Sequence, residues 1–257
     1  VKRNAPKPTP KATIARVDCK DLSVDKFLSE YMIPNVPVII TNITENWNIL
    51  KWLNKDGSLN KDEISKQYGD SMVSIHICSK QIRDMGRMES KDMSVREYLE
   101  CWDSKKSQGI AQKELMYLKD WNFCKDFPND NIYNTPPYFT EDWLNEYEAD
   151  QASDHRFIYL GPKGTFTPLH KDTLCSFSWS TNVTGRKRWW MIPPDLEPAL
   201  LEEGGRGSLF DLREPDYERF PRLPEVEAAV MEFVQVTLRS MYSVYHRFVL
   251  TMFHITR

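Results

Sequence analysis

The stretch that decides the fold runs from residue 157 to residue 194. It reads Phe157-Ile-Tyr-Leu-Gly-Pro162, Phe166-Thr-Pro-Leu-His-Lys-Asp172, Ser176-Phe-Ser-Trp-Ser180, Gly185-Arg-Lys-Arg-Trp-Trp190 and Ile192-Pro-Pro194. Short apolar or alternating runs that are separated by Gly and Pro are typical of β-strands joined by turns. We therefore expect this stretch to form the strand-rich centre of the molecule.

The centre of that stretch is His170-Lys171-Asp172. A His and an Asp two residues apart on an extended strand point to the same face. One imidazole and one carboxylate supply two ligands of the 2-His-1-carboxylate arrangement, which holds Fe(II) and leaves other positions open. A lone His is also common as a structural residue, so the surroundings of His170 decide between the two interpretations.

Two further polar residues favour the metal site. Thr167 precedes His170, and Lys187 follows it on a run that predicts the next long strand. A hydroxyl and an ammonium that face one pocket can hold the far carboxylate of a small dicarboxylic acid, because charge-assisted hydrogen bonds to carboxylates are strong. Arg186 and Arg188 alternate with Lys187, so we expect them on the opposite face.

The run from Ser176 to Ser180 alternates serines with Phe177 and Trp179. This period of two predicts a strand with aromatic rings on one face and small hydroxyls on the other. Small hydroxyls that line an iron pocket leave room for a co-substrate. The alternative interpretation is a half-buried strand of any β-sandwich.

These motifs resemble those of a known family. Thr167-x-x-His170-x-Asp172, followed by Gly185-x-Lys187-Arg-Trp and Pro193-Pro194, is similar to the core of the jumonji-C oxygenases. Longer phrases, Tyr117-Leu-Lys-Asp-Trp-x-x-Cys124-x-Asp-Phe-Pro128 among them, resemble those of its lysyl hydroxylases, which act on a translation termination factor. The resemblance covers roughly residues 17–234.

The resemblance implies a mainly β fold, a double-stranded β-helix (jelly roll) with flanking helices. It implies a dioxygenase that uses Fe(II) and 2-oxoglutarate, with a protein as substrate and a lysine of a release factor as the first candidate. Iron would be held by His170, Asp172 and a third ligand, and 2-oxoglutarate by Thr167, Lys187 and Tyr117. On the sequence alone, Tyr117 fits a core position equally well.

The last part of the chain, residues 235–257, departs from the family. The third ligand of the family is a His after a phrase that reads roughly Val-Phe-Val-Pro-x-Gly-Trp-x-His, and no such phrase occurs here. We take His246 as the candidate third ligand, on a Tyr242–Val249 strand facing His170, and His254 as the second choice. If the residues from Ser240 are back-translated and the codons are read in a frame shifted by two bases, they permit Tyr-Val-Phe-Gly-Leu-Pro-Ser. That sequence resembles the missing phrase. We therefore expect a frame shift shortly after Val234.

The sequence predicts the following organisation. Residues 1–16 form a flexible lead-in, with a targeting signal as the alternative, and the first residue is Val, so we expect a piece of a longer protein. Residues 17–234 form the jumonji-C domain, with a helical and strand part over 17–150 and the jelly-roll core over 155–234. Residues 235–257 are an atypical tail. The earlier elements are helices at 23–32, 61–68 and from Ser94, strands at 37–41, 72–78 and 115–120, and a helix capped by Thr140. In the first helix we expect Val24, Phe27, Leu28 and Tyr31 on one face, and Ser94-Val-Arg-Glu97 predicts a capping box.

Composition excludes several classes of function. The 257 residues carry a net charge of −3 with 40% hydrophobic and 28% charged residues, so we expect neither a nucleic-acid binder nor a membrane-surface protein. Five cysteines without Cys-x-x-Cys indicate neither a disulfide framework nor a zinc ribbon. The predicted compartment is the cytoplasm, with the nucleus as a further one, and we expect neither a signal peptide nor a membrane-spanning run.

Two other functions stay open. A cupin-like binding module without catalysis follows if the third ligand is absent, and iron titration distinguishes it from an oxygenase. A sugar-binding jelly roll does not account for Lys187 and Thr167 beside the His-x-Asp motif. Histone demethylation is not favoured, because no reader domain or basic surface accompanies the core. His76, within a predicted strand, is interpreted as structural.

Overall fold

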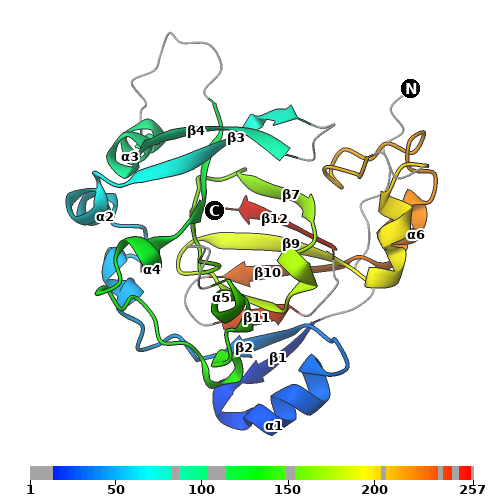
Figure 1. Cartoon of the computed structure of the whole chain (residues 1–257), viewed down its shortest axis with the longest axis horizontal. Coiled ribbons are helices and arrows are strands. Elements are labelled where there is room, and N and C mark those ends of the chain that lie inside the picture. Colours follow the sequence, from blue (N-terminus) through cyan, green and yellow to red (C-terminus); the bar gives the residue numbers. More distant parts are fainter. Residues whose placement is uncertain are drawn as a thin grey trace.

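The computed structural model of the chain describes residues 14–82, 87–103, 114–148, 154–203, 207–236, 240–244 and 249–255. Within these residues the strands form three four-stranded sheets with short helices around them (Figure 1). The strands are β1 (Ala15–Asp18), β2 (Val38–Thr41), β3 (Met72–Ile82), β4 (Arg87–Ser94), β5 (Met116–Trp121), β6 (Ile158–Leu160), β7 (Phe166–His170), β8 (Ser178–Thr181), β9 (Arg186–Ile192), β10 (Met231–Val236), β11 (Ser240–Val244) and β12 (Val249–Ile255).

Two of the sheets form the jelly-roll core. One has the order β10-β9-β12-β7 and the other β1-β2-β11-β8. All pairings in them are antiparallel except β1 with β2. Gln235 of β10 links the two sheets, because its side chain accepts from Trp189 Nε1 at 3.2 Å and donates to the carbonyl of Ser180 at 3.1 Å. The expected mainly β jelly-roll fold is confirmed.

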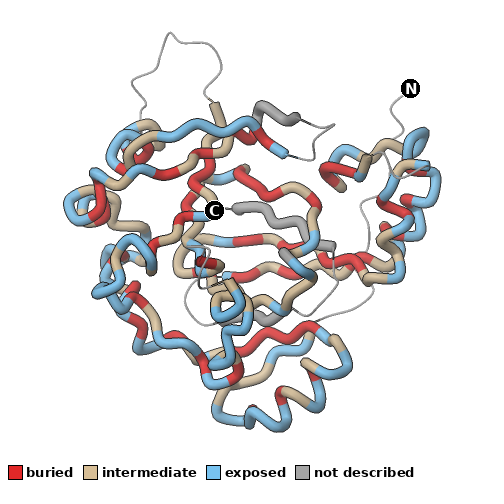
Figure 2. The backbone as a smooth tube through the Cα atoms, in the orientation of Figure 1, coloured by how far each residue is buried: buried red, intermediate tan, exposed pale blue. Residues whose placement is uncertain are grey.

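The third sheet, β4-β3-β5-β6, comes mostly from residues that precede the core. Its buried residues pack with aromatic side chains of the neighbouring helix and loops, including Trp52, Tyr68 and Phe123. Tyr68 and Phe123 meet edge to face with ring centroids 4.9 Å apart, a favoured aromatic geometry. Figure 2 shows buried residues along the strands and exposed residues on the outer helices.

The described helices are short. They are α1 (Val24–Phe27), α2 (Lys61–Tyr68), α3 (Val95–Asp103), α4 (Phe123–Asp126), α5 (Trp143–Tyr147) and α6 (Leu223–Ala229). Among the described residues no helix combines the length and apolar character that crossing a membrane requires. The predicted capping box at the start of α3 forms, since Ser94 N donates to Glu97 Oε2 at 2.9 Å and Glu97 N donates to Ser94 Oγ at 3.2 Å.

Two expectations about helices were wrong. The cap of α5 is Asp142 and not Thr140, because Thr140 has helical backbone angles and ends the 3₁₀ turn Pro137–Phe139. A cap needs non-helical angles, which Asp142 has.

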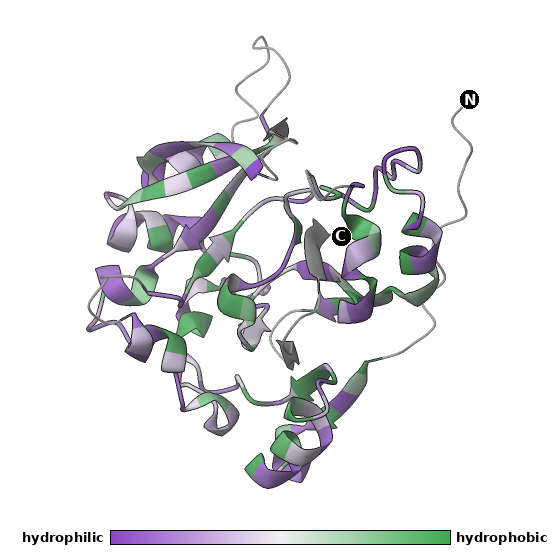
Figure 3. Cartoon of the chain, turned by 45° about the vertical axis from the view of Figure 1, so that its right-hand side comes forward, coloured by the Kyte–Doolittle hydropathy of each residue, from purple (hydrophilic) through white to green (hydrophobic). Residues whose placement is uncertain are grey.

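Val24, expected on the buried face of the first helix, is 39% exposed while Phe27 is fully buried. After Phe27 the helix widens into a π-helical turn, Leu28–Met32, which changes the spacing of the face. Hydrophobic and hydrophilic residues mix along α1 (Figure 3).

Strand β7 contains a β-bulge. Leu250 of β12 pairs with His170, whereas Met252 pairs with Thr167. A shift of two residues along β12 therefore corresponds to a shift of three residues along β7. The extra residue falls at Pro168-Leu169, where Pro has no N–H to donate and Leu169 N donates to the carbonyl of Phe210 at 3.0 Å. An extra residue reverses the alternation of faces beyond it.

The tail from residue 235 takes part in both core sheets. β11 lies between β2 and β8, and β12 lies between β9 and β7. The strand that pairs with β7 is therefore Val249–Ile255, while Ser240–Val244 pairs in the other sheet. Residues 242–244 of the expected Tyr242–Val249 strand thus lie in the core sheet that does not contain β7, and His246 lies outside the described residues.

Candidate functional site

His170 and Asp172 come together at the end of β7. The strand ends at His170, so Asp172 stands in the following loop and not on the strand itself. Even so, His170 Nε2 lies 3.6 Å from Asp172 Oδ1. His170 Nδ1 lies 2.7 Å from the carbonyl of Pro168. Because a carbonyl only accepts, Nδ1 carries the proton and Nε2 presents its lone pair, as a metal-binding imidazole requires.

Asp172 is held by a serine of β8. Ser178 Oγ donates to Asp172 Oδ2 at 2.5 Å. Burial alone would raise the pKa of Asp172, but the neighbouring His170 side chain and the hydrogen bond from Ser178 outweigh it and hold this pKa below its ordinary value. Asp172 is therefore an ionised carboxylate at neutral pH, with a hydroxyl from the predicted serine face of β8 fixing its orientation.

Lys187 of β9 is a buried cation. Lys187 is 5% exposed, and among the described residues no carboxylate forms an ion pair with its ammonium. The ammonium lies 5.5 Å from the centroid of the Tyr159 ring. Burial lowers the pKa of Lys187 to about 8. A buried ammonium without an anion is costly, so this position fits the binding of an anionic group. Arg186 is exposed, as expected for the opposite face.

Thr167 and Tyr117 are linked to the Lys187 end through the Tyr159 ring, whose centroid is 6.1 Å from that of Tyr117 and 5.5 Å from Lys187 Nζ. Both are buried, and burial raises the pKa of the Tyr117 hydroxyl well above its ordinary value despite a hydrogen bond with Thr167. Tyr117 therefore stays protonated and can donate. It also packs in the core cluster with Phe166 and Trp189, so the core interpretation of this tyrosine applies as well.

The bulge in β7 places Thr167 and His170 on one face of the sheet. Residues three apart on a regular strand face opposite sides. The extra residue at Pro168-Leu169 cancels this difference, so Thr167 and His170 share a face. Across β12, Leu250 pairs with both His170 and Met191. Lys187 is four residues from Met191, about 13 Å along the strand direction. A lysine side chain and a five-carbon dicarboxylate together span such a gap.

Tyr159, on β6, was not singled out from the sequence. Its ring centroid is 6.1 Å from that of Tyr117, and its hydroxyl donates to Asp120 Oδ1 at 2.8 Å. Lys119 pairs with Asp120 at 2.7 Å. The signal for Tyr159 was present in the alternation of Phe157 and Tyr159 before the His-x-Asp motif, because alternate residues of a strand share a face.

The described side chains offer no third metal ligand beside His170 and Asp172. Within the described part of the chain, no three His, Cys, Asp or Glu side chains form a metal-binding group. The backbone of His254 pairs with Lys187 and lies four residues from Leu250, the partner of His170. That is about 13 Å along the strand, so the register does not favour His254. His170 and Asp172, an imidazole and a carboxylate, fit two positions of an Fe(II) site.

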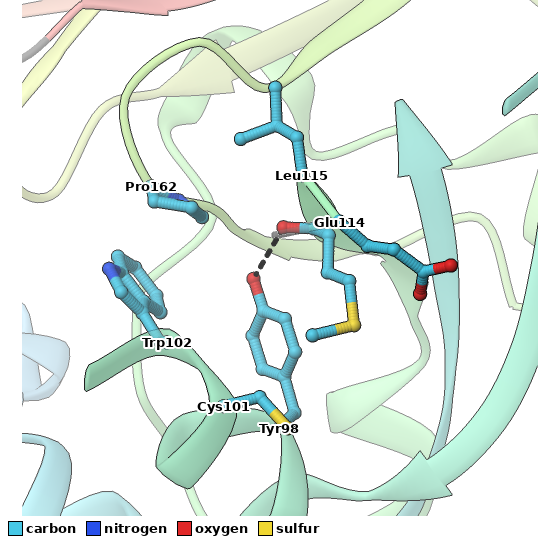
Figure 4. Close-up of a pocket in the computed structure, with 7 residues that line it drawn as sticks. Tyr98, Cys101, Trp102, Glu114, Leu115 and Pro162 are labelled. Carbon is cyan, nitrogen blue, oxygen red and sulfur yellow. Dashed lines mark hydrogen bonds between the residues drawn. The ribbon is translucent and has the colours of Figure 1, made fainter. Parts of the chain in front are cut away.

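Other candidate features lie elsewhere. His76, interpreted as structural, is partly covered on β3, and burial lowers the pKa of its imidazole. A cavity of about 190 Å³ lies between α3 and β5 (Figure 4). Tyr98, Trp102 and Pro162 contribute to its lining, and Tyr98 donates to the carbonyl of Met116 at 3.4 Å. None of the candidate site residues lines this cavity.

Comparisons with known proteins agree with this fold. A profile of the cupin-like domain family matches residues 24–236. The Arabidopsis thaliana protein named arginine-specific demethylase JMJ20 is 35% identical over 81% of this chain and 48% of its own length. The proteins named 2-oxoglutarate and iron-dependent oxygenase JMJD4 from Danio rerio and Homo sapiens are 37% and 35% identical, over 71% and 70% of this chain and 44% and 43% of their own lengths.

The fold thus defines a cupin-like domain, with the strands of His170 and Lys187 in its jelly-roll core. The chain belongs to the jumonji-C family of cupin-like proteins. It spans a little under half the length of the curated relatives named above.

Proposed function

We propose that the protein is an Fe(II)- and 2-oxoglutarate-dependent oxygenase that hydroxylates a lysine side chain of another protein, with a translation release factor as the substrate. The observation that supports the proposal is the buried Lys187 ammonium, which lacks a carboxylate partner among the described residues and stands on β9, one strand (β12) away from the strand of His170. A dicarboxylate that reaches from a metal at His170 and Asp172 to Lys187 accounts for both features.

The residues would act in named roles. His170 Nε2 and Asp172 would hold the metal, with Ser178 keeping the Asp172 carboxylate in place. Lys187 and Thr167 would bind the far carboxylate of 2-oxoglutarate, and Tyr117 would donate its phenol to the same carboxylate. Because Lys187 and Tyr117 are buried, water competes weakly for these charged hydrogen bonds.

The reaction balances as follows. Bound iron with 2-oxoglutarate and O₂ supplies the oxidation of a C–H bond. One oxygen atom of O₂ enters the substrate as a hydroxyl, and the other enters succinate as 2-oxoglutarate loses CO₂. The chain's own contribution is to hold the co-substrate at both ends and to keep the Lys187 end dry.

The substrate class rests on resemblance. The lysyl hydroxylases of the family share the phrases around Tyr117 and Ser176, and they act on a translation termination factor. One relative is named an arginine-specific demethylase, so an arginine is the alternative substrate that the experiment must include.

A second function is a binding module of cupin type with impaired catalysis. The observation that favours it is the lack of a metal-binding group of three side chains within the described part of the chain. Two protein ligands hold a labile divalent ion far less well than three, and iron would then leave or oxidise.

The experiment compares three forms of the protein: the chain as given, the same chain with the family ending Pro-x-Gly-Trp-x-His restored after Val234, and the His246→Ala variant. Iron(II) titration in the presence of 2-oxoglutarate measures metal binding, and succinate formation measures turnover. Mass spectrometry of a release-factor fragment then reports oxygen added to a lysine or loss of methyl from an arginine.

We expect weak iron binding and little succinate from the chain as given, and stoichiometric iron with sustained turnover once the ending is restored. Full activity of the unmodified chain that disappears in His246→Ala would show that the tail supplies the third ligand. If the restored chain binds neither iron nor 2-oxoglutarate, the proposed function is wrong.

A further inference from the structure

Tyr159 lies where the third sheet packs against the jelly-roll core. Alternate residues of a strand point to opposite faces. On β6, Ile158 and Leu160 pack with the third sheet and its helices, whereas Tyr159 packs against the core cluster that contains Trp189. Trp189 and Lys187 are two residues apart on β9 and are both buried, so they share a face of that strand. The ring of Tyr159 therefore meets the face of β9 on which Lys187 lies.

A β-bulge in β5 fixes the hydroxyl of Tyr159. The register of β5 with β6 shifts between Leu118 and Trp121, so two residues, Lys119 and Asp120, stand opposite Tyr159 alone. Asp120 has a φ of +60°, in the left-handed region that residues with side chains adopt only at a cost. In this conformation Asp120 Oδ1 accepts the Tyr159 hydroxyl at 2.8 Å, and Lys119 Nζ lies 2.7 Å from Asp120 Oδ2. A carboxylate that is itself held by an ammonium thus keeps the phenol in place.

The ring held in this way contacts the Lys187 ammonium. Lys187 Nζ lies over the Tyr159 ring, 5.5 Å from its centroid. The face of an aromatic ring is negative and attracts a cation, and the attraction is larger away from water. Because the Tyr159 hydroxyl donates to the Asp120 carboxylate, the ring is more electron-rich and attracts the ammonium more strongly.

A ring and a carboxylate would stabilise this ammonium in different ways. A carboxylate would neutralise Lys187, and an incoming anion would first have to displace it. The ring of Tyr159 stabilises the ammonium without neutralising it, so an anionic ligand gains a charge-assisted hydrogen bond and breaks no ion pair. The ring also restricts a flexible four-carbon side chain before the ligand arrives, which lowers the entropic cost of binding.

We propose that Tyr159 is a positioning residue for the co-substrate: its ring, fixed by Asp120, holds the Lys187 ammonium where the far carboxylate of 2-oxoglutarate binds. This inference rests on the proposed function, because it names the residue that orients Lys187 for the co-substrate of that reaction. Tyr159 acts through Lys187, so it affects a ligand only through the carboxylate that Lys187 binds.

The test compares two ligands that differ only in that carboxylate. 2-Oxoglutarate has it, and 2-oxopentanoate has the same five-carbon chain with a methyl group in its place. Ligand-observed NMR titration of the full chain without metal measures both dissociation constants, and their ratio is the preference for the far carboxylate. A general loss of packing weakens both ligands and leaves this ratio unchanged. The variants are Tyr159→Leu, which removes the ring, and Tyr159→Phe, which removes only the hydroxyl.

We expect the wild type to prefer 2-oxoglutarate by roughly tenfold or more, because a charged hydrogen bond distinguishes the two ligands. Tyr159→Leu should reduce this preference roughly three- to tenfold, and Tyr159→Phe should reduce it less. In a Lys187→Met background, Tyr159→Leu should change the preference no further. That dependence on Lys187 distinguishes a positioning residue from one that only packs.

Two matched controls remove the same groups elsewhere in the molecule. Trp102→Leu removes a ring whose centroid is 4.8 Å from Lys61 Nζ, and Tyr217→Phe removes a hydroxyl that donates to Glu227 Oε1 at 2.8 Å. Both controls should keep the preference of the wild type.

An equal preference in the wild type and Tyr159→Leu would overturn the inference and leave the proposed function intact. A further loss caused by Tyr159→Leu in the Lys187→Met background would overturn it as well. A wild type without any preference would refute Lys187 as the anchor of the co-substrate, and the inference with it. A preference that depends on Tyr159 in a chain that never binds iron supports the inference and refutes the oxygenase, leaving a dicarboxylate-binding module.

Discussion

The two ends of the candidate site differ in their access to water. At the Lys187 end, Lys187 is 5% exposed, Tyr117 is fully buried and Thr167 is 6% exposed. At the metal-ligand end, the side chains of His170 and Asp172 are 38% and 28% exposed. The buried Lys187 end holds a charge only at a cost in free energy, which an anionic ligand relieves. The more exposed metal-ligand end leaves its donor atoms open to a metal and to a substrate.

The largest expected effect comes from substitutions at the metal-ligand end. His170→Ala and Asp172→Ala each remove a donor that no described side chain replaces, so we expect metal binding to be lost. Titration with Fe(II) or Mn(II), followed by calorimetry, measures it. Metal occupancy that survives in both variants would place the metal site elsewhere.

At the Lys187 end, the variant Lys187→Met should change co-substrate binding and the stability of the fold in opposite directions. The variant removes a charged hydrogen bond to the co-substrate, which we expect to weaken 2-oxoglutarate binding by about 1.5–3 kcal/mol while metal binding is largely kept. Met fills similar volume without charge, so the free energy of unfolding without ligand should increase by roughly 3 kcal/mol. Calorimetric titration and chemical denaturation measure the two.

Lys187→Arg is the matched control for that experiment. It keeps the charge but offers a planar fork to a position shaped for a point charge, and we expect 2-oxoglutarate binding to fall here too. Unchanged affinity for 2-oxoglutarate in both variants would remove Lys187 from the co-substrate site.

The same lysine predicts a pH dependence of stability. Its pKa falls from 10.5 to about 8 on burial. Below pH 8 the ammonium is charged in the folded and unfolded states, and its burial penalty is fully present. Between about pH 8 and 10.5 the unfolded chain binds more protons, so the free energy of unfolding should rise with pH by roughly 3 kcal/mol in total. Over the same range 2-oxoglutarate should bind less well.

Denaturation curves across pH 7 to 11, with and without 2-oxoglutarate, measure this effect. Lys187→Met is the control, since the contribution of this group should vanish in it. A wild type and a Lys187→Met variant whose stabilities differ by the same amount at every pH would show that Lys187 keeps its ordinary pKa.

The smallest expected effect is at Ser178. Ser178→Ala removes the hydroxyl that holds Asp172 Oδ2, and loss of such a supporting hydrogen bond typically lowers metal affinity by roughly tenfold or more. Ser180→Ala is the control, because the described contact of Ser180 uses its backbone carbonyl. Equal metal affinity in the two variants would mean that Ser178 does not position Asp172.

Local patterns determined much of the secondary structure. The helix over 61–68, the capping box at Ser94 and the alternation along 186–188 depend on contacts between residues a few positions apart, so they could be predicted from the sequence. The cap of α5 and the exposure of Val24 could not. They depend on the turn before Thr140 and on the wider turn after Phe27, which local preferences do not fix.

The sequence by itself determined which residue types meet: an imidazole and a carboxylate two residues apart, and a lysine on a later strand. Only the tertiary structure decided how they face. The bulge at Pro168-Leu169 turns Thr167 to the side of His170, and the bulge at Asp120 turns its carboxylate toward Lys119 and Tyr159. Bulges depend on pairing with another strand, here β12 and β6. Such long-range pairings leave no periodic trace in either strand alone, and so the sequence could name the site residues but not their geometry.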